Sequence, residues 1–315
     1  MTDAPERILL LQLYHLGDVI LTTPTIRAAR LAFPNARIDF VTNALGAQAL
    51  EGNPHLNHIL VKPPFWYISR TRYQAVVDLH SVPRTARTVV FTGARVRIGL
   101  RGRGPRNLAY TQLLPRENNA VYMALQKLRM LAPLGVVPEA ADLALEMAID
   151  DDKHNWARQT FAQLGLGSRV VAVSPVAKHE FKQWGAQRWA RVADALADAG
   201  AQILITSGPG EEAQAEAVAN AMKQHAVWRY GRTSVRQLAA LYARCSLWIG
   251  NDGGPKHMAV AVHTPTVTVY RRALGGVWSD PTDPKQTAIN SGQESLDTIS
   301  EQQVISAGLN ALEKQ

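Results

Sequence analysis

The stretch RILLLQLYHLGDVILTTPTIRAARLAF, residues 7–33, decides the fold class. Its apolar run at 7–13 is typical of a strand that is buried on both faces of a parallel sheet. Gly17 permits a tight turn, and residues 18–33 carry apolar side chains at helical spacing. A strand, a turn and a helix in this order form the repeating unit of doubly wound α/β sheets.

The same order recurs along the whole chain. Further apolar runs of strand length lie at 37–43, 58–61, 73–79, 95–100, 169–175, 202–208, 226–231, 247–251 and 265–270. Helical spacing is found at 120–135, 186–200, 211–225 and 234–245, and a terminal amphipathic helix is expected at 300–315. The sequence therefore predicts an α/β protein with two Rossmann-like, doubly wound domains that face each other across a cleft.

A boundary between the two domains is expected near residue 150. There a proline and an acidic cluster interrupt the pattern, in LGVVPEAADLALEMAIDDDKHNW (134–156). We expect one domain at residues 1–150 and a second at 151–315, whose last helix could pack back on the first. Ligands of such sheets bind beyond the carboxyl ends of the strands, so the turns after the strands are expected to carry the chemistry.

Composition places the chain among globular proteins. Of its 315 residues 46% are hydrophobic and 19% charged, and no uninterrupted apolar run reaches the roughly 18 residues of a membrane helix. Its one cysteine, Cys245, forbids an internal disulfide and is expected in the core, and the start of the chain lacks the pattern of a secretory signal. These observations favour the cytoplasm.

The positive charge is concentrated in one segment. The net charge is +8, and residues 62–116 contain eleven Lys or Arg against one acid, Asp78, a formal charge of +10. Such a field attracts nucleic acid, an anionic membrane surface or a phosphorylated ligand. The alternative is a solvated basic face without a ligand.

The turn after the first strand offers a carboxylate. Asp18 stands at the start of the following helix, where it either caps the helix or serves as a general base for an incoming hydroxyl. A dinucleotide fingerprint needs three spaced glycines at this turn, and only Gly17 is present. This weakens a dehydrogenase interpretation.

Two turns of the second half offer positive charge and carboxylates. In SPVAKHEFKQWGAQRW (174–189), Lys178 and Lys182 flank a loop that leads into a helix, and cations at a helix start stabilise phosphate oxygens. In ITSGPGEE (205–212), Glu211 and Glu212 either cap a helix or hold a ribose hydroxyl pair. For the lysines, exposed loop charge is the alternative.

The stretch IGNDGGPKHMAV, residues 249–260, predicts a phosphate cradle. Asp252, Gly253 and Gly254 follow a strand, and Pro255 fits the first turn of a helix, whose backbone N–H groups favour an anion. Lys256 or His257 would add positive charge against a diphosphate. Asp252 would cap the helix or hold a sugar or ribose hydroxyl.

No metal site is predicted. The acids at 150–152 have the D-x-D spacing of metal-dependent sugar transfer, but they stand ahead of a helix, where acidic capping is favoured. The nine histidines show no H-x-x-x-H spacing and no cysteine partners.

Taken together, these motifs resemble glycosyltransferase family 9, the ADP-heptose:lipopolysaccharide heptosyltransferases. The resemblance runs from residues 8–42 through YQAVVDLH and ARVRIGL to FKQWGAQRW and GNDGGPKHMAVAVHTPTVTVY. It implies a GT-B fold and an inverting, metal-independent glycosyltransferase without a cofactor, with an N-terminal acceptor domain and a C-terminal nucleotide-sugar domain. The chain departs from the family pattern at Gly185, at Gly253 and in RRALGG (271–276), so a donor other than ADP-heptose stays open.

The resemblance also assigns roles to residues. Asp18 matches the general base and Lys182 the cation at the donor diphosphate. Nucleotide-sugar contacts are expected from Ser174, Lys178, Lys182, Glu211, Glu212, Asp252, Gly253, Gly254 and His257. For the acceptor, an anionic lipid-linked oligosaccharide of the lipopolysaccharide inner core, we expect contacts from Gly17, Lys62, Arg84, Arg103, Arg106 and Arg116.

These roles place the protein in the cytoplasm, with peripheral association at the inner face of the cytoplasmic membrane and no nucleic-acid partner. The alternatives are a GT-B transferase or epimerase that uses another nucleotide sugar, and a non-catalytic polyanion-binding protein.

Overall fold

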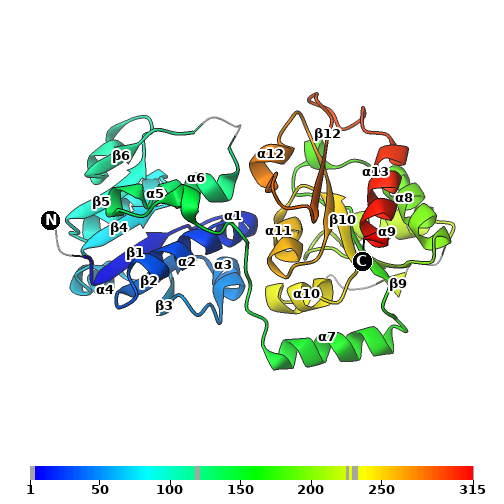
Figure 1. Cartoon of the computed structure of the whole chain (residues 1–315), viewed down its shortest axis with the longest axis horizontal. Helices are drawn as coiled ribbons and strands as arrows, with labels where there is room; N and C mark the ends of the chain where they lie inside the picture. Colours follow the sequence, from blue (N-terminus) through cyan, green and yellow to red (C-terminus); the bar gives the residue numbers. More distant parts are fainter. Residues whose placement is uncertain (1–3, 118–120, 225–226, 229–232, 315) are drawn as a thin grey trace. The chain divides into compact units, whose positions relative to one another are not determined.

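The computed structural model describes residues 4–117, 121–224, 227–228 and 233–314. The chain forms two compact units, Met1–Ala148 (unit 1) and Ile149–Gln315 (unit 2) (Figure 1). In the described ranges no helix combines the length and hydropathy that a bilayer-crossing segment requires.

Unit 1 is built on a parallel sheet of six strands in the order β3-β2-β1-β4-β5-β6. The strands are β1 (Arg7–Leu11), β2 (Arg37–Thr42), β3 (His58–Val61), β4 (Ala75–Asp78), β5 (Val96–Leu100) and β6 (Gln112–Leu114). The helices are α1 (Leu16–Ile20), α2 (Thr23–Ala32), α3 (Ala44–Leu50), α4 (Phe65–Arg70), α5 (Pro83–Phe91) and α6 (Met123–Arg129), with 3-10 turns η1 (Pro105–Ala109), η2 (Ala132–Leu134) and η3 (Pro138–Ala140).

The two faces of this sheet bury separate apolar layers. On one face α1, α2 and α6 pack on alternate strand residues, with Val19, Ile26 and Leu128 fully buried. On the other face α4, α5 and η1 cover the sheet, and Ile68 and Val89 are fully buried there. Strands that are buried on both faces explain why the sequence shows continuous apolar runs rather than alternation.

Unit 2 has a second parallel six-stranded sheet, ordered β12-β11-β10-β7-β8-β9. Its strands are β7 (Val170–Ser174), β8 (Gln202–Ile205), β9 (Val227–Trp228), β10 (Leu247–Asn251), β11 (Thr266–Tyr270) and β12 (Gln286–Asn290). The helices are α7 (Asp151–Gln163), α8 (Ala186–Asp198), α9 (Glu212–Ala221), α10 (Val235–Tyr242), α11 (Gly254–Ala261), α12 (Gly275–Trp278) and α13 (Glu301–Glu313), with the 3-10 turn η4 (Glu180–Lys182).

Within unit 2, α8, α9 and α13 cover one face of the sheet, as Figure 1 also shows. The terminal helix α13 packs on α8, where Leu196 contacts the position of Gly308. Counted from its own first strand, this sheet repeats the strand order of unit 1. The predicted α/β class with two doubly wound sheets is confirmed.

Each sheet has one point where the strand order reverses, between β1 and β4 in unit 1 and between β7 and β10 in unit 2. Because all strands of a sheet run parallel, their carboxyl ends meet at one edge, which we call the carboxyl edge. The reversal point at this edge is where doubly wound sheets bind ligands. The turns after β1, β4, β7 and β10 are therefore the places to examine.

Some predicted boundaries were wrong for identifiable reasons. The single helix expected at 18–33 is two helices, because Pro24 lacks an N–H and begins a new helix after Thr22. The hydroxyls of Thr22 and Thr23 donate to carbonyls of the first helix at this break. The edge strands β6 and β12 were not predicted, because their polar residues interrupt the apolar pattern. As predicted, Asp150 caps a helix: it accepts the backbone N–H of Lys153 at the start of α7.

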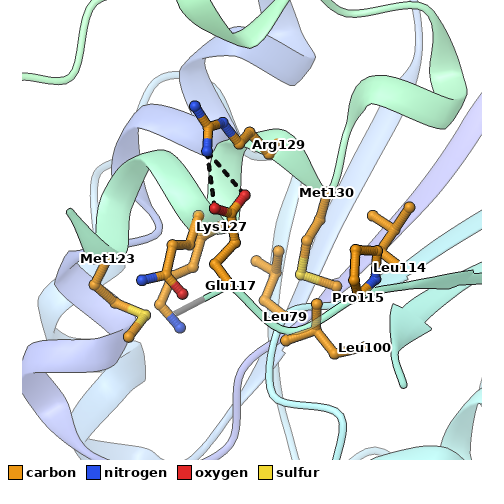
Figure 2. Close-up of a pocket in the computed structure, with 10 residues that line it drawn as sticks. Leu79, Leu100, Leu114, Pro115, Glu117, Met123, Lys127, Arg129 and Met130 are labelled. Carbon is orange, nitrogen blue, oxygen red and sulfur yellow. Dashed lines mark hydrogen bonds and ion pairs between the residues drawn. The ribbon is translucent and has the colours of Figure 1, made fainter. Parts of the chain in front are cut away.

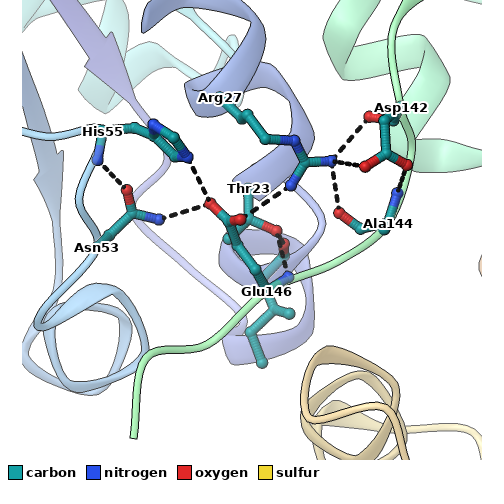
Figure 3. A network of polar contacts seen from close by, with 8 residues as sticks. Thr23, Arg27, Asn53, His55, Asp142, Ala144 and Glu146 are labelled. Atoms are coloured by element: carbon teal, nitrogen blue, oxygen red, sulfur yellow. Dashed lines mark hydrogen bonds and ion pairs between the residues drawn. The ribbon is translucent and has the colours of Figure 1, made fainter. Parts of the chain in front are cut away.

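The segment that leaves unit 1 is fixed to α2 by Arg27 (Figure 3). Its guanidinium donates to Glu146 Oε2 at 2.9 Å, to Asp142 Oδ2 at 3.0 Å and to the carbonyl of Ala144 at 2.9 Å. The backbone N–H of Glu146 in turn donates to the hydroxyl of Thr23. Arg27 and Thr23 together thus hold residues 142–146 against the helix.

Candidate functional site

The carboxylate predicted as the base lies at the carboxyl edge of unit 1. Asp18 stands in α1, after β1, with Oδ1 3.4 Å from the Nζ of Lys127. Lys127 belongs to α6, is only 5% exposed, and also donates to Gln12 Oε1 at 2.9 Å. The buried ammonium holds the Asp18 carboxylate in place at the carboxyl edge.

The turn after β4 lies beside this pair. His80 contacts the ring of Tyr14 edge to face, with the ring centroids 5.5 Å apart, and Tyr14 accepts a hydrogen bond from Arg84 at 2.7 Å. Burial, with a smaller effect of the Lys127 charge, lowers the pKa of His80 to about 4, so the imidazole is neutral at physiological pH. Its Nδ1 is buried and has no hydrogen-bond partner among the described residues.

The one acid of the basic segment does not compensate its charge. Asp78, at the end of β4, is fully buried, and burial raises the pKa of its carboxyl. It accepts hydrogen bonds from the hydroxyl of Tyr110 at 2.7 Å and from the backbone N–H of Ser81 at 2.8 Å. Asp78 therefore has a structural part in the turn, and the surface of the segment stays positive.

The residues predicted for the acceptor all follow strands at the carboxyl edge of unit 1. Gly17 lies in α1 after β1, Lys62 after β3, Arg84 in α5 after β4, Arg103 and Arg106 after β5, and Arg116 after β6. By contrast, Arg70, Arg72, Arg95 and Arg97 lie at or near the amino ends of β4 and β5. The basic segment thus divides between two edges of the sheet. The side chain of Arg106 is not free, because it packs against the backbone of Gly102.

An apolar pocket of about 150 Å³ lies beside α6, and Lys127 forms part of its wall (Figure 2). Glu117 and Arg129 form a bidentate ion pair at 2.9 Å on the same wall. The other lining residues are Leu79, Leu100, Leu114, Pro115, Met123, Gln126 and Met130. Lys127 therefore connects this pocket to Asp18.

In unit 2, two of the predicted donor residues contact each other. Lys182, in η4 after β7, donates from Nζ to Asp252 Oδ2, which follows β10, at 2.5 Å. This pair lines a small pocket of about 70 Å³ together with Phe181 and Arg271. The guanidinium of Arg271 lies over the ring of Phe181, 4.3 Å from its centroid. The pocket thus combines the ion pair of Lys182 and Asp252 with the ring of Phe181 and with Arg271, which follows β11 and also pairs with Glu294 at 3.3 Å.

The predicted cradle forms the start of α11. Gly253 is the residue before the helix, with an extended backbone (φ −173°) that any residue adopts, and Gly254 and Pro255 open the first turn. A Cβ at Gly253 would meet only Pro255, in an ordinary contact. The backbone at position 253 therefore does not require a glycine.

Neither Lys256 nor His257 supplies the predicted additional charge. Lys256 is fully buried and donates to the carbonyl of Trp278 at 2.7 Å and to Gln286 Oε1 at 2.8 Å, and burial lowers the pKa of its ammonium to about 7. His257 is buried next to Trp278, and burial lowers its pKa well below the ordinary value. Its Nδ1 has no hydrogen-bond partner within the described part of the chain, so His257 offers a neutral imidazole.

The remaining predicted donor residues differ in accessibility. Ser174 is buried at the end of β7 and interacts with Tyr242. Lys178 is exposed. Glu211 folds back on its own turn and accepts the backbone N–H of Gly208 at 2.9 Å, whereas Glu212 is the first residue of α9. Glu211 occupies the N-cap position of α9 without a side-chain hydrogen bond to the helix, and its carboxylate instead holds the turn before it.

Several residues of these sites were not predicted. Lys127, His80 and Tyr14 in unit 1, and Phe181 and Arg271 in unit 2, were missed as site residues. The sequence contains one indication for Lys127, because this lysine stands among the apolar positions of the helix expected at 120–135. Over the ranges that the structure describes, no group of three or more His, Cys, Asp or Glu is placed to hold a metal ion.

Comparisons with known proteins agree with this architecture. Residues 67–307 match the family described as glycosyltransferase family 9 (heptosyltransferase). The chain is 28% identical over 279 residues to lipopolysaccharide heptosyltransferase 3 of Escherichia coli K12, covering 82% of this chain and 80% of that protein.

Two solved structures share the fold. The family 9 glycosyl transferase of Veillonella parvula is 24% identical, with a TM-score of 0.89 and 98% of both chains covered. The E. coli heptosyltransferase WaaC with ADP is 21% identical, with a TM-score of 0.73, covering 98% of this chain and all of that one. The predicted GT-B class is thereby confirmed. With the family match spanning most of its length, the chain belongs to glycosyltransferase family 9, the heptosyltransferases.

Proposed function

We propose that the protein transfers heptose from ADP-heptose to a hydroxyl of a lipopolysaccharide inner-core acceptor, without a metal ion and with inversion at the anomeric carbon. Family membership, the named lipopolysaccharide heptosyltransferase among its relatives and the relative solved with ADP support this choice. The observation that carries it is the Asp18 carboxylate held beside Lys127 at the carboxyl edge of unit 1.

In the proposed step, Asp18 takes the proton of the acceptor hydroxyl while that oxygen attacks the anomeric carbon of the heptose. The bond from this carbon to the diphosphate breaks, and ADP leaves with the bonding electron pair. A single displacement from the opposite side inverts the anomeric carbon. General base catalysis of this kind contributes about two to four orders of magnitude in rate.

The donor diphosphate would be bound in unit 2 by Lys182, by Lys178 and by the backbone N–H groups at the start of α11. These positive groups would stabilise the negative charge that develops on the leaving ADP. Because Lys182 is paired with Asp252, the diphosphate must exchange with this carboxylate. Asp252 is then free to bind a hydroxyl of the ribose or the sugar. Ser174, Glu212, Gly253, Gly254 and neutral His257 complete the proposed donor contacts, and Glu211 is retained only as a second ribose candidate.

The cations at the carboxyl edge of unit 1 would bind phosphate and carboxylate groups of the lipid-linked acceptor. Gly17 would contribute through its backbone next to Asp18, and Lys62, Arg84, Arg103, Arg106 and Arg116 would supply the charge. An acceptor of this kind is anchored in a bilayer, so we propose a cytoplasmic protein with peripheral association at the inner membrane face.

ADP release tests the proposal. The purified protein is incubated with ADP-heptose and a deacylated inner-core acceptor, each alone and both together, with and without EDTA. We expect ADP only when donor and acceptor are both present, and no loss of rate in EDTA. ADP release without acceptor, or abolition by EDTA, would contradict the scheme. A thermal-shift series should show ADP-linked ligands stabilising the protein far more than UDP- or GDP-linked ones.

A further inference from the structure

A patch of exposed apolar side chains lies on the outer side of α4, α5 and η1 in unit 1. Its members, which we call the aromatic patch, are Phe65, Trp66, Val90, Phe91 and Leu108, with exposed fractions from 42% to 84%. The rings of Phe65 and Phe91 stack 4.2 Å apart, which joins α4 to α5, and η1 packs against α5. Exposed apolar residues that lie together in this way mark an interaction surface.

The fold does not need these side chains. The opposite sides of the same elements supply the core, where Ile68, Ala86 and Val89 are buried against the sheet. Each of these short elements is therefore apolar on two sides. Packing against the sheet of unit 1 explains the inner apolar side of each element but not the outer one.

Positive charge surrounds the aromatic patch. Arg70 places its guanidinium over the ring of Trp66, 5.6 Å from the centroid. Arg87 lies in α5 one turn before Val90 and Phe91, and its side chain makes no hydrogen bond or ion pair with any residue that the structure describes. Because Asp78, the one acid between residues 62 and 116, is buried, this charge has no local compensation within the segment.

We infer that the aromatic patch and Arg87 dock the protein on the surface of a bilayer that contains anionic phospholipid. Aromatic side chains prefer the membrane–water interface, and nearby Lys or Arg residues are attracted by anionic headgroups. This surface deepens the peripheral association proposed above and rests on that part of the proposed function.

The arrangement of the patch favours lipid over nucleic acid. Single-stranded nucleic acid needs free aromatic faces on which bases stack. Phe65 and Phe91 each cover one face of the other's ring, and Arg70 covers one face of Trp66, which leaves fewer ring faces for bases. The aliphatic side chains of Val90 and Leu108 offer bases no stacking surface, whereas they insert readily among acyl chains.

Helix α5 connects the patch to the proposed acceptor edge. Arg84, Arg87 and Phe91 are three and four residues apart, so they form one stripe along the exposed side of the helix. Arg84 lies at one end of this stripe and donates a hydrogen bond to Tyr14. This end of the stripe is the one near Asp18. A bilayer against the stripe would therefore present lipid-linked phosphates to the carboxyl edge.

Co-sedimentation of the full chain with vesicles tests the inference. One vesicle contains phosphatidylcholine alone, and the other contains phosphatidylcholine with phosphatidylglycerol. We expect binding to the second that weakens with salt. Replacement Trp66→Ser should lower the affinity about tenfold, from the lost apolar insertion. Loss of one cation costs about fivefold, so the charge reversal Arg87→Glu should cost on the order of twentyfold.

Two matched variants serve as controls. Leu31→Ser removes an exposed leucine from α2, on the opposite face of unit 1, and Arg169→Glu reverses an exposed arginine in unit 2. Both should bind vesicles as the unchanged protein does. Leu108→Ser is a second patch variant in case Trp66→Ser unfolds, which circular dichroism would show.

Equal vesicle binding by Trp66→Ser, Leu108→Ser and the unchanged protein would overturn the inference. So would tight binding to a single-stranded DNA oligonucleotide that Trp66→Ser weakens, because the occupant would then be nucleic acid. ADP release with a soluble acceptor is measured in parallel and should be unaffected by the patch variants. If ADP release fails in every protein while vesicle binding follows expectation, the proposed heptose transfer fails and the docking surface stands.

Discussion

Asp18 in α1 and Lys127 in α6 form an ion pair of 3.4 Å, although they are far apart in the sequence. The lysine is the more deeply buried partner, and its hydrogen bond to Gln12 fixes the ammonium at the end of β1. The orientation of the proposed base thus depends on a helix from the other end of unit 1.

Replacement Asp18→Asn keeps the shape of the side chain and removes its ability to take a proton. We expect ADP release to fall about a hundredfold or more, while calorimetric ADP affinity changes little. The control is Asp152→Asn, which makes the same replacement at an exposed carboxylate in the first turn of α7. Normal turnover by Asp18→Asn would remove this residue from the mechanism.

Lys127 should act as a positioning residue. Lys127→Met removes the ammonium and leaves Asp18 and Gln12 without their shared donor, whereas Lys127→Arg keeps a positive charge. A hydrogen bond to a charged group contributes about 2 kcal/mol, so kcat should fall about thirtyfold in Lys127→Met with an unchanged KM for ADP-heptose. The arginine variant should recover part of this loss. A changed donor KM in both variants would point to a structural effect instead.

The pair of Lys182 and Asp252 predicts opposite effects on donor affinity. Lys182→Ala removes a cation and should weaken ADP binding, by about tenfold to a hundredfold. Asp252→Asn frees Lys182 from its internal partner and should tighten binding of ADP itself. Titration calorimetry at low and high salt measures both. If Asp252→Asn weakens ADP binding as much as Lys182→Ala does, the carboxylate does not compete with the diphosphate.

Buried Lys256 predicts a pH dependence of stability. Its pKa is lowered from 10.5 to about 7 in the folded protein, mainly by burial, so the unfolded chain binds more protons between pH 7 and about 10. The free energy of unfolding should therefore rise with pH across this window. Lys256→Met should flatten the rise, as measured by urea denaturation at several pH values. An identical pH profile for the variant would show that Lys256 is charged in the fold.

The Arg27 network predicts a local contribution to stability. Arg27→Met leaves Asp142 and Glu146 without their guanidinium and should lower the free energy of unfolding by about 2 kcal/mol. The matched control is Arg158→Met on an exposed helix side, where Asn155 is the one partner of the arginine among the described residues, and it should change little. Hydrogen exchange should locate the change at residues 142–146. An equal decrease in the free energy of unfolding in Arg27→Met and Arg158→Met would argue against a specific contribution of the Arg27 network.

The strands were predictable because the sheets are buried on both faces. Continuous apolar runs such as 7–13 and 247–251 identify parallel strands, and the parallel order then brings their following turns to one edge. This is why the positions of Asp18, Lys182 and Asp252 at the carboxyl edges could be predicted from the sequence. The edge strands β6 and β12 could not, because polar residues interrupt their apolar pattern.

Side-chain partners were harder to predict than positions. The residues next to position 127 in the sequence do not indicate that its ammonium contacts Asp18, because this contact depends on how α6 packs on the sheet. Lys256 stands in the first turn of α11, where an anion site is expected, yet its side chain turns to the carbonyl of Trp278. The direction of a long side chain depends on tertiary packing, which the sequence pattern does not specify.

Each apolar layer described above is drawn from one unit only, with residues 8–131 in the layers of unit 1 and 171–312 in that of unit 2. These three layers are therefore completed without residues of the other unit. We expect both halves to stay folded in chimeras that join unit 1 of this chain to unit 2 of a relative. The crossover should follow residues 142–146, the segment that Arg27 binds. Such exchanges would allow donor preference and acceptor preference to evolve, or to be engineered, separately.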